Sequence, residues 1–328
     1  MAKSWKENLL KSSLPLEYET ACILAANDIL VNGEYSYVRP NENNIDTDFS
    51  IDTHAEDYFY LGKEEVWAEL QYIIECKYCH ENVNWVFYPA IDTIEGHGFL
   101  DPYDFLTPYV LESEYLENFD SNMEYAIKGL ELLPESANPN TIIRGLEQLR
   151  HATANVIFQS IKKTFEHPFS AEYPIQIFAP ILVTTAKLRI LNDDIKIEEI
   201  KKATEIEDIS KTVESLLIIP PHNLSFDKYF SDLKSKYLTP YEKAMRNLYT
   251  ALGKVKETDI IAQSIYPSMA NFKLPNACQR ILVVNLESLD KNLKTIHRRI
   301  QSAKKDLKTF GKVESVFFSE EYKIKPEL

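Results

Sequence analysis

The spacing of apolar residues divides the first ninety residues into one helix and a series of short strands. Residues 16–31 carry apolar side chains at helical spacing, and Asn32 and Gly33 are typical of a helix end. Strand-like runs separated by short polar turns follow at residues 35–38, 47–55, 66–78 and 84–91. One helix followed by consecutive strands predicts a mixed sheet with the helix packed against one face.

Helical and strand-like segments alternate along the rest of the chain. Residues 92–140 are expected to be irregular, whereas the apolar spacing predicts a helix at 141–167 and a β-rich segment at 174–191. Further segments are expected as helices at 194–214, at 238–252 and after 258, a buried strand at 280–285 and a helix at 287–307. The chain is therefore expected to be an α/β protein with two parts: a core at 1–192 with a helical insertion at about 112–168, and a mostly helical α/β region at 193–328.

The composition is that of an ordinary globular chain with a strong acidic excess. Of its 328 residues 45% are hydrophobic, which excludes a disordered chain because this fraction suffices for a core. The formal net charge of −14 gives no overall attraction to a polyanion, so nucleic-acid binding would require a local basic face or metal ions. No stretch is apolar enough to span a membrane, and the N-terminus lacks the apolar segment of a secretory signal.

Cysteine usage predicts a reducing, cytoplasmic location. The four cysteines are too few for a disulfide framework in a chain of this length. Cys76 and Cys79, followed by His80, have a spacing seen in zinc sites. We do not expect zinc there, because a structural site usually needs a second such pair and the chain has none.

Two of the expected strands bring acidic residues and a lysine to one face of the sheet. Alternation along 66–78 directs Glu75 and Lys77 to one side. Alternation along 47–55 places two sets of residues on opposite faces of the strand. One set is Phe49, Ile51 and Thr53, and the other is Asp48, Ser50, Asp52 and His54. If the two strands pair, Asp52 meets Glu75 and Lys77 on a shared face.

Two carboxylates and an amine placed together on one sheet face reduce the stability of the fold, so such a group suggests a functional role. Carboxylates are preferred ligands of Mg²⁺, which keeps several waters and polarises a phosphoryl oxygen. A lysine beside such a water can position it and can stabilise negative charge on the phosphate. These residue types at this spacing therefore predict a phosphodiester hydrolase.

Asp52 and the run Glu75-Cys76-Lys77, preceded by the helix at 16–31, resemble the PD-(D/E)XK nuclease superfamily, which includes many restriction enzymes. The runs FSIDTHA, ELQYIIECKY and NWVFYP look like a group of bacterial nuclease-like proteins with an IECK…WVF signature. One departure is Ile51, because the superfamily pattern often has Pro before the acid. The resemblance covers residues 14–91 and, more loosely, 174–191.

The resemblance implies a restriction-endonuclease-like mixed sheet flanked by helices, with Mg²⁺ or Mn²⁺ as cofactor and DNA as the usual substrate. In this superfamily the first helix often supplies an acid near the metal, and Glu17 matches that place. The implied metal ligands are Asp52, Glu75 and Glu17, and Lys77 completes the catalytic set. Many such nucleases dimerise to cut two strands, so a homodimer is a further expectation, although no residue identifies its interface.

Several neighbouring polar residues stay open as members of this site. Asp46 or Asp48 would replace Asp52 as the ligand if the strand register differed. His54 and Gln71 share the expected face and could contact metal or substrate, although an ordinary surface role is the default for both.

The segment 291–312 concentrates positive charge. It contains eight Lys and Arg against one Asp, and its first four cations are Lys291, Lys294, Arg298 and Arg299. Such a helix could follow the phosphates of a nucleic acid. It could equally pair with acidic surface of the protein itself or of a protein partner.

Two functions from different classes follow from these patterns. The first is a Mg²⁺-dependent nuclease, most often on DNA, in bacterial defence or DNA processing. The alternative is a catalytically inactive protein with the nuclease fold that binds a protein partner through its acidic surface.

Overall fold

The computed structural model describes residues 5–41, 43, 45–61, 66–91, 99–100, 102–103, 123–133, 136–166, 175–241 and 277–306. Its helices are α1 (Trp5–Lys11), α2 (Leu14–Ala26), α3 (Asn140–Glu166), α4 (Ile197–Lys202), α5 (Leu224–Tyr237) and α9 (Leu289–Asp306), with short 3-10 turns at Ile206–Asp208, Thr239–Tyr241 and Leu286–Ser288. Its strands are β1 (Leu30–Pro40), β2 (Asp46–Leu61), β3 (Val66–Lys77), β4 (Asn84–Pro89), β5 (Pro102–Tyr103), β6 (Tyr125–Leu133), β7 (Ser136–Asn138), β8 (Ile175–Thr184), β9 (Lys187–Leu191), β10 (Ser210–Thr212), β11 (Ser215–Ile218) and β12 (Ile281–Asn285).

The described strands form one mixed sheet, in the order β1-β2-β3-β8-β12-β11-β6-β4-β9-β10. The first three strands are antiparallel, whereas β3 pairs with β8 in parallel and β8 pairs with β12 in parallel. The expected boundary between 1–192 and 193–328 does not separate two sheets, because β11 and β12 lie between β8 and β6. A mixed sheet flanked by helices, the coarse form of the expected fold, is confirmed.

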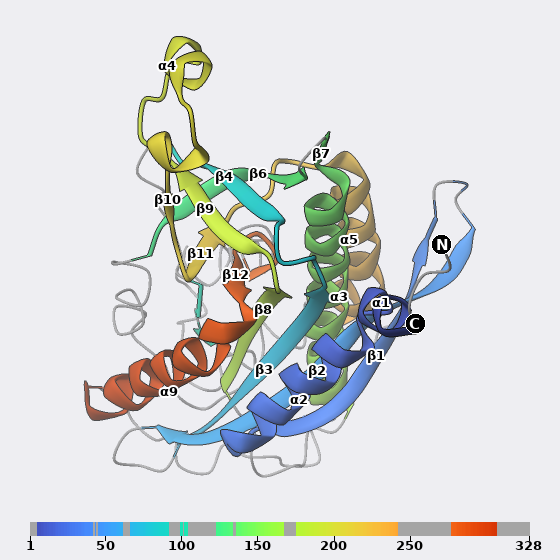
Figure 1. Cartoon of the computed structure of the whole chain (residues 1–328). Helices are drawn as coiled ribbons and strands as arrows, with labels where there is room; N and C mark the ends of the chain where they lie inside the picture. Colours follow the sequence, from blue (N-terminus) through green and yellow to red (C-terminus); the bar gives the residue numbers. More distant parts are fainter. Residues whose placement is uncertain are drawn as a thin grey trace, which may run out of the picture.

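Helices cover both faces of the sheet (Figure 1). Helix α3 packs against β2, β3 and β8 and carries α5 on its outer side, whereas α2 and α9 contact each other on the opposite face. Successive residues of β3 therefore enter different cores: Ile73 packs in the cluster with α3, and Ile74 packs in the cluster with α2 and α9. The long apolar run of β3 reflects this burial on both faces.

The first helix ends earlier than its apolar pattern predicts. Helix α2 stops at Ala26, and β1 begins at Leu30, so the expected helix over 16–31 is wrong in its last turn. Asp28 adopts a left-handed backbone with φ 61°, which turns the chain from helix to strand. Gly33, expected at the helix end, lies inside β1 at φ 84°, where the pairing with β2 shifts register.

The expected helical insertion at about 112–168 is also corrected. Residues 125–133 and 136–138 are strands, and within the described part of this range the helix begins at Asn140. At Gly129, strand β6 lies so close to Phe87 of β4 that a Cβ atom there would be 2.6 Å from the Phe87 ring. Cross-strand packing of this kind is not visible in local spacing.

The C-terminal part contains less helix at 194–214 than expected and one helix that was missed. Residues 194–214 hold only the short α4, a 3-10 turn and β10. Helix α5 follows Pro220 and Pro221, and the side chain of Asn223 caps it by accepting the N–H groups of Ser225 and Phe226. Of the helix expected at 238–252, the structure describes only 238–241, which include the 3-10 turn Thr239–Tyr241. The rest of that segment and the helix expected after 258 lie outside the described residues. The strand at 280–285 and the helix at 287–307 are confirmed as β12 and α9.

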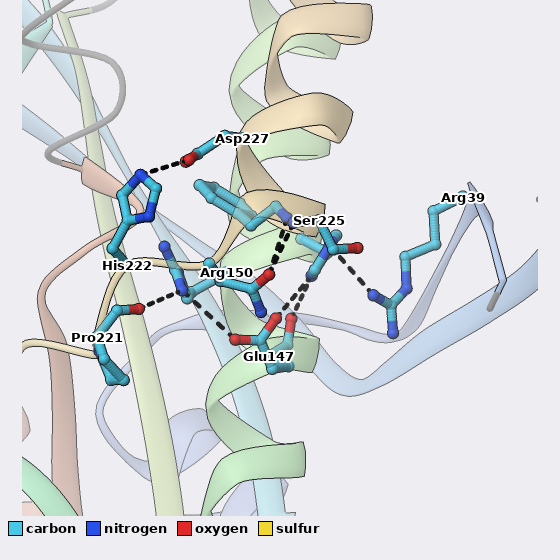
Figure 2. A network of polar contacts seen from close by, with 10 residues as sticks. Arg39, Glu147, Arg150, Pro221, His222, Ser225 and Asp227 are labelled. Atoms are coloured by element: carbon cyan, nitrogen blue, oxygen red, sulfur yellow. Dashed lines mark hydrogen bonds and ion pairs between the residues drawn. The ribbon is translucent and has the colours of Figure 1, made fainter.

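A polar network joins α3 to the start of α5 and to the end of β1 (Figure 2). Arg150 is buried and donates to Glu147 at 3.4 Å and to the carbonyl of Pro221 at 3.2 Å. The Nδ1 of His151 lies 2.7 Å from the Glu147 carbonyl, which can only accept, so the ring proton is on Nδ1. Its Nε2 is then the acceptor for Arg39 at 3.1 Å.

This arrangement keeps His151 neutral. Burial, together with the charge of Arg39, lowers the pKa of His151 from 6.5 to about 3. The unfolded chain therefore binds a proton between these pH values that the folded chain excludes, so stability falls as the pH falls through this window.

We expect His151→Gln to reduce this pH dependence. Between pH 7 and pH 5 the wild type should lose on the order of 1–2 kcal/mol more unfolding free energy than the variant. Urea unfolding at both pH values measures this difference, with exposed His80→Gln as the control. Equal losses in wild type and His151→Gln would show that His151 is not held neutral.

Candidate active site

An irregularity in β2 sets the position of Asp52. Tyr35 of β1 pairs with Ile51, but Gly33 pairs with His54, so β2 has one residue more than β1 across this step. Ile51 consequently packs in the core under α3, whereas Thr53 pairs with Ile74, which lies in the core on the other side. The expected alternation, with Ile51 and Thr53 on one face, is therefore wrong, because a bulge interrupts it.

Asp52 lies beyond the last pair of the β2–β3 ladder, which is Thr53 with Ile74. The N–H of Cys76 thus has no β2 carbonyl opposite it, and it donates instead to Oδ2 of Asp52 at 2.6 Å. This bond fixes the carboxylate of Asp52 next to the strand that carries Glu75 and Lys77.

Glu75 and Lys77 share the face of β3 that α3 covers. The Nζ of Lys77 contacts Oε1 of Glu75 and also donates to the side chain of Gln148 at 3.1 Å. The side chain of Glu75 is 1% exposed and that of Lys77 is 22% exposed, so the amine lies between the core and the solvent. The other oxygen of Glu75, Oε2, is buried and has no hydrogen-bond partner among the described residues.

The electrostatics of the site disfavour two carboxylate charges. Burial, and next the charge of Asp52, raise the pKa of Glu75 to about 7, although Lys77 and the nearby backbone N–H of Asp52 act in the opposite direction. Burial also raises the pKa of Asp52, against the N–H of Cys76 and the charge of Lys77. A positive charge is therefore the kind of occupant that this pair of carboxylates favours.

Glu17 of α2 lies within electrostatic reach of this group. Burial, followed by the charges of Asp52 and Glu34, raises its pKa, and the charge of Lys77 lowers it. Pro15 near the start of α2 and the buried contacts of Leu16 and Thr20 hold the helix against the sheet at this point. Asp52, Glu75 and Lys77 therefore lie together on β2 and β3, and Glu17 interacts electrostatically with Asp52 and Lys77 from α2.

The residues left open by the sequence lie elsewhere or make other contacts. Asp48 is exposed opposite Val38 in β1, at a distance along the strand from the end of the β2–β3 ladder. The ring of His54 lies 3.3 Å from Gln71, which in turn bonds Gln176 at 2.6 Å. His54 and Gln71 thus form part of a polar network between strands and α3.

Mg²⁺ fits the donors present, although the described residues contain no group of three or more His, Cys, Asp or Glu side chains placed to hold a metal ion. Mg²⁺ commonly uses only one or two protein carboxylates and completes its shell with water. Oε2 of Glu75 has no hydrogen-bond partner within the described part of the chain, and Asp52 is a second carboxylate in electrostatic contact with Glu75. The thiols of Cys76 and Cys79 do not share a face, because Cys76 packs in the core with α2 and α9 and Cys79 packs in the core with α3.

Some of the cations of the basic helix α9 form ion pairs within the protein. Its apolar stripe packs in the α2-side core, and Lys291 and Lys294 pair with Glu214 and Asp290. Arg298 is exposed and bonds the carbonyl of Lys294 at 3.2 Å, and Arg299 is half-buried. The cations at 304, 305, 308 and 312 have side chains outside the described part of the chain.

One residue of this neighbourhood was missed by sequence reasoning. Gln148 reaches Lys77 from α3, more than seventy residues further along the chain. No local motif marks it, because the contact depends on how α3 lies across the sheet.

Comparison of the chain with family models, curated proteins and solved structures found no match in any of the three. Among the described residues, no helix has the length and apolar character needed to cross a membrane.

We expect Asp52→Asn to be more stable than Asp52→Ala by about 1–2 kcal/mol. Both variants remove the charge, but only Asn keeps an oxygen that can accept the N–H of Cys76, and an unsatisfied buried donor is costly. Urea unfolding of both variants measures the difference. The matched pair Asp48→Asn and Asp48→Ala, at an exposed position of the same strand, should differ much less; equal stability of the two Asp52 variants would contradict the bond.

Proposed function

We propose that this protein is a Mg²⁺-dependent phosphodiester hydrolase with a restriction-endonuclease-like core, and that its substrate is DNA. The observation that carries the proposal is the buried carboxylate of Glu75 next to Asp52: one of its oxygens contacts Lys77, and the other has no hydrogen-bond partner among the described residues. A carboxylate in such a place is destabilising by itself, and a bound cation removes that cost.

The chain's own residues divide the work between them. Glu75 and Asp52 would hold Mg²⁺, and Glu17 of α2 would supply a further oxygen. The cation, when bound, neutralises charge on the phosphate and acidifies a water. Lys77 is the only one of these groups that carries positive charge, and its partly exposed amine can orient the attacking water and stabilise the phosphate.

The arrangement of the elements supports the same reading. An acid on β2 and Glu75-x-Lys77 on β3 lie at the end of an antiparallel ladder, with α2 preceding β1 in the chain and α3 preceding β8, the parallel neighbour of β3. The resemblance of this segment to the PD-(D/E)XK superfamily implies these roles for these positions. Contacts of Arg298 and Arg299 with DNA phosphates, and a homodimer that cuts both strands, belong to the proposal as well.

We expect Lys77→Ala and Asp52→Asn each to reduce Mg²⁺-dependent cleavage by about 10²-fold or more, because the first removes the amine that would act on the water and phosphate and the second removes a carboxylate that would hold Mg²⁺. Cleavage of plasmid DNA, single-stranded DNA and RNA should be followed on gels, with circular dichroism to show that the variants are folded.

Glu19→Gln is the control, because this exposed acid lies on α2 two residues from Glu17. It should cleave like the wild type. Cleavage that survives both Lys77→Ala and Asp52→Asn, or that persists in excess chelator, rules out the proposed mechanism. Cleavage of RNA alone would keep the mechanism and change the substrate.

The alternative, an inactive protein with a nuclease fold that binds a protein partner, draws on the net charge of −14 and on the absence of three preassembled ligands among the described residues. Calorimetric titration separates the two. The nuclease proposal expects Mg²⁺ or Mn²⁺ to bind the wild type and to bind Glu75→Gln more weakly. Absence of binding, together with absence of cleavage of any nucleic acid, would favour the alternative.

A further inference from the structure

Helix α3 reaches the amine of Lys77 through one side chain, that of Gln148. The Oε1 of Gln148 accepts from Nζ of Lys77 at 3.1 Å, and its Nε2 donates to the carbonyl of Ser50 at 3.4 Å. Ser50 lies in β2 just before the bulge that places Asp52. One amide therefore connects the strand of the lysine, the strand of the acid and the helix that covers both.

The close approach of α3 depends on Gly145, which lies three residues before Gln148 and so on the same side of the helix. A Cβ at Gly145 would lie 2.8 Å from Cδ1 of Leu182 and 3.4 Å from Cε of Lys77. The first distance is too short for any side chain without a shift of its neighbour. A glycine at this place thus leaves room for the stem of Lys77 under the helix.

Lys77 needs such a contact because its stem is flexible and its ammonium group has three donors without a fixed direction. Glu75 contacts the amine from the same strand, two residues away, and directs it toward the buried carboxylate. Only Gln148 contacts the amine from another element among the described residues. The two contacts together limit where Nζ can lie relative to Asp52.

We infer that Gln148 is a positioning residue that holds the amine of Lys77 in its working place, an inference that rests on the proposed nuclease function. It acts through Lys77 and does not itself contact the reacting phosphate. Because a shift of about 1 Å in a catalytic group can cost about 10²-fold in rate, loss of this contact should lower kcat and leave KM nearly unchanged.

The test compares three variants of α3 in the full chain. Gln148→Met keeps the length of the side chain and removes both hydrogen bonds, and it should lower kcat about 10- to 100-fold. Gln148→Glu keeps an acceptor for Nζ and should lose less activity than Gln148→Met. Gln159→Met is the matched control, because Gln159 lies on the same helix and bonds Tyr237 at 3.3 Å; it should behave like the wild type.

A second measurement does not depend on nuclease activity. The rate at which Lys77 is acetylated by acetic anhydride, read by peptide mass spectrometry, should rise several-fold in Gln148→Met and stay at the wild-type value in Gln159→Met. Gln148→Glu should keep most of the protection. If Gln148→Met does not fold, the Gln148→Glu variant still distinguishes the acceptor role from a packing role.

The outcomes separate this inference from the proposed function. If the wild type cleaves no nucleic acid but Lys77 becomes more reactive in Gln148→Met, the contact stands and the nuclease proposal fails. Unchanged acetylation of Lys77 in Gln148→Met overturns the inference, even if kcat falls, because Gln148 would then act by another route. Unchanged kcat in an active enzyme also overturns it.

Discussion

The burial of the Glu75 carboxylate is the constraint on which this part of the molecule depends. Strand β3 is covered on both faces, by α3 on one and by α2 and α9 on the other, so the side chain of Glu75 has no access to solvent. A charge in such surroundings costs several kcal/mol unless it is compensated. Lys77 compensates one oxygen, and the other has no partner among the described residues. Because only one oxygen of Glu75 is compensated in the described residues, a bound cation would be favourable at the other.

The bulge in β2 determines the position of Asp52 at the end of the β2–β3 ladder. If β2 and β3 paired regularly past Thr53, a backbone carbonyl of β2 would accept the N–H of Cys76, and the carboxylate of Asp52 would not be needed as its acceptor. The extra residue sends Ile51 into the core under α3 and leaves Asp52 to bind that N–H. The acid is therefore held by a backbone bond, which keeps it in place despite the repulsion from Glu75.

Distant parts of the chain make this arrangement rigid. The last residues of β3 pair with β8, and β8 pairs in turn with β12, which comes from the C-terminal third of the chain. Helix α3 closes over the same region because Gly145 allows its approach. The network of Arg39, Glu147, Arg150 and His151 then ties α3 to β1 and to α5. The strands that carry the acids thus have packed neighbours on every side.

The sequence by itself determined the identity of the candidate residues and their strands. Alternation placed Glu75 and Lys77 on one face, and the apolar runs located β2, β3, β4 and β12, because side-chain period and burial are local properties. It could not show the early end of α2, the strand at Tyr125–Leu133, the bulge before Asp52 or the contact of Gln148 with Lys77. These features depend on residues far apart in the chain. The pairing of β1 with β2 determines where the bulge lies, and the orientation of α3 on the sheet determines which of its side chains contacts the amine of Lys77.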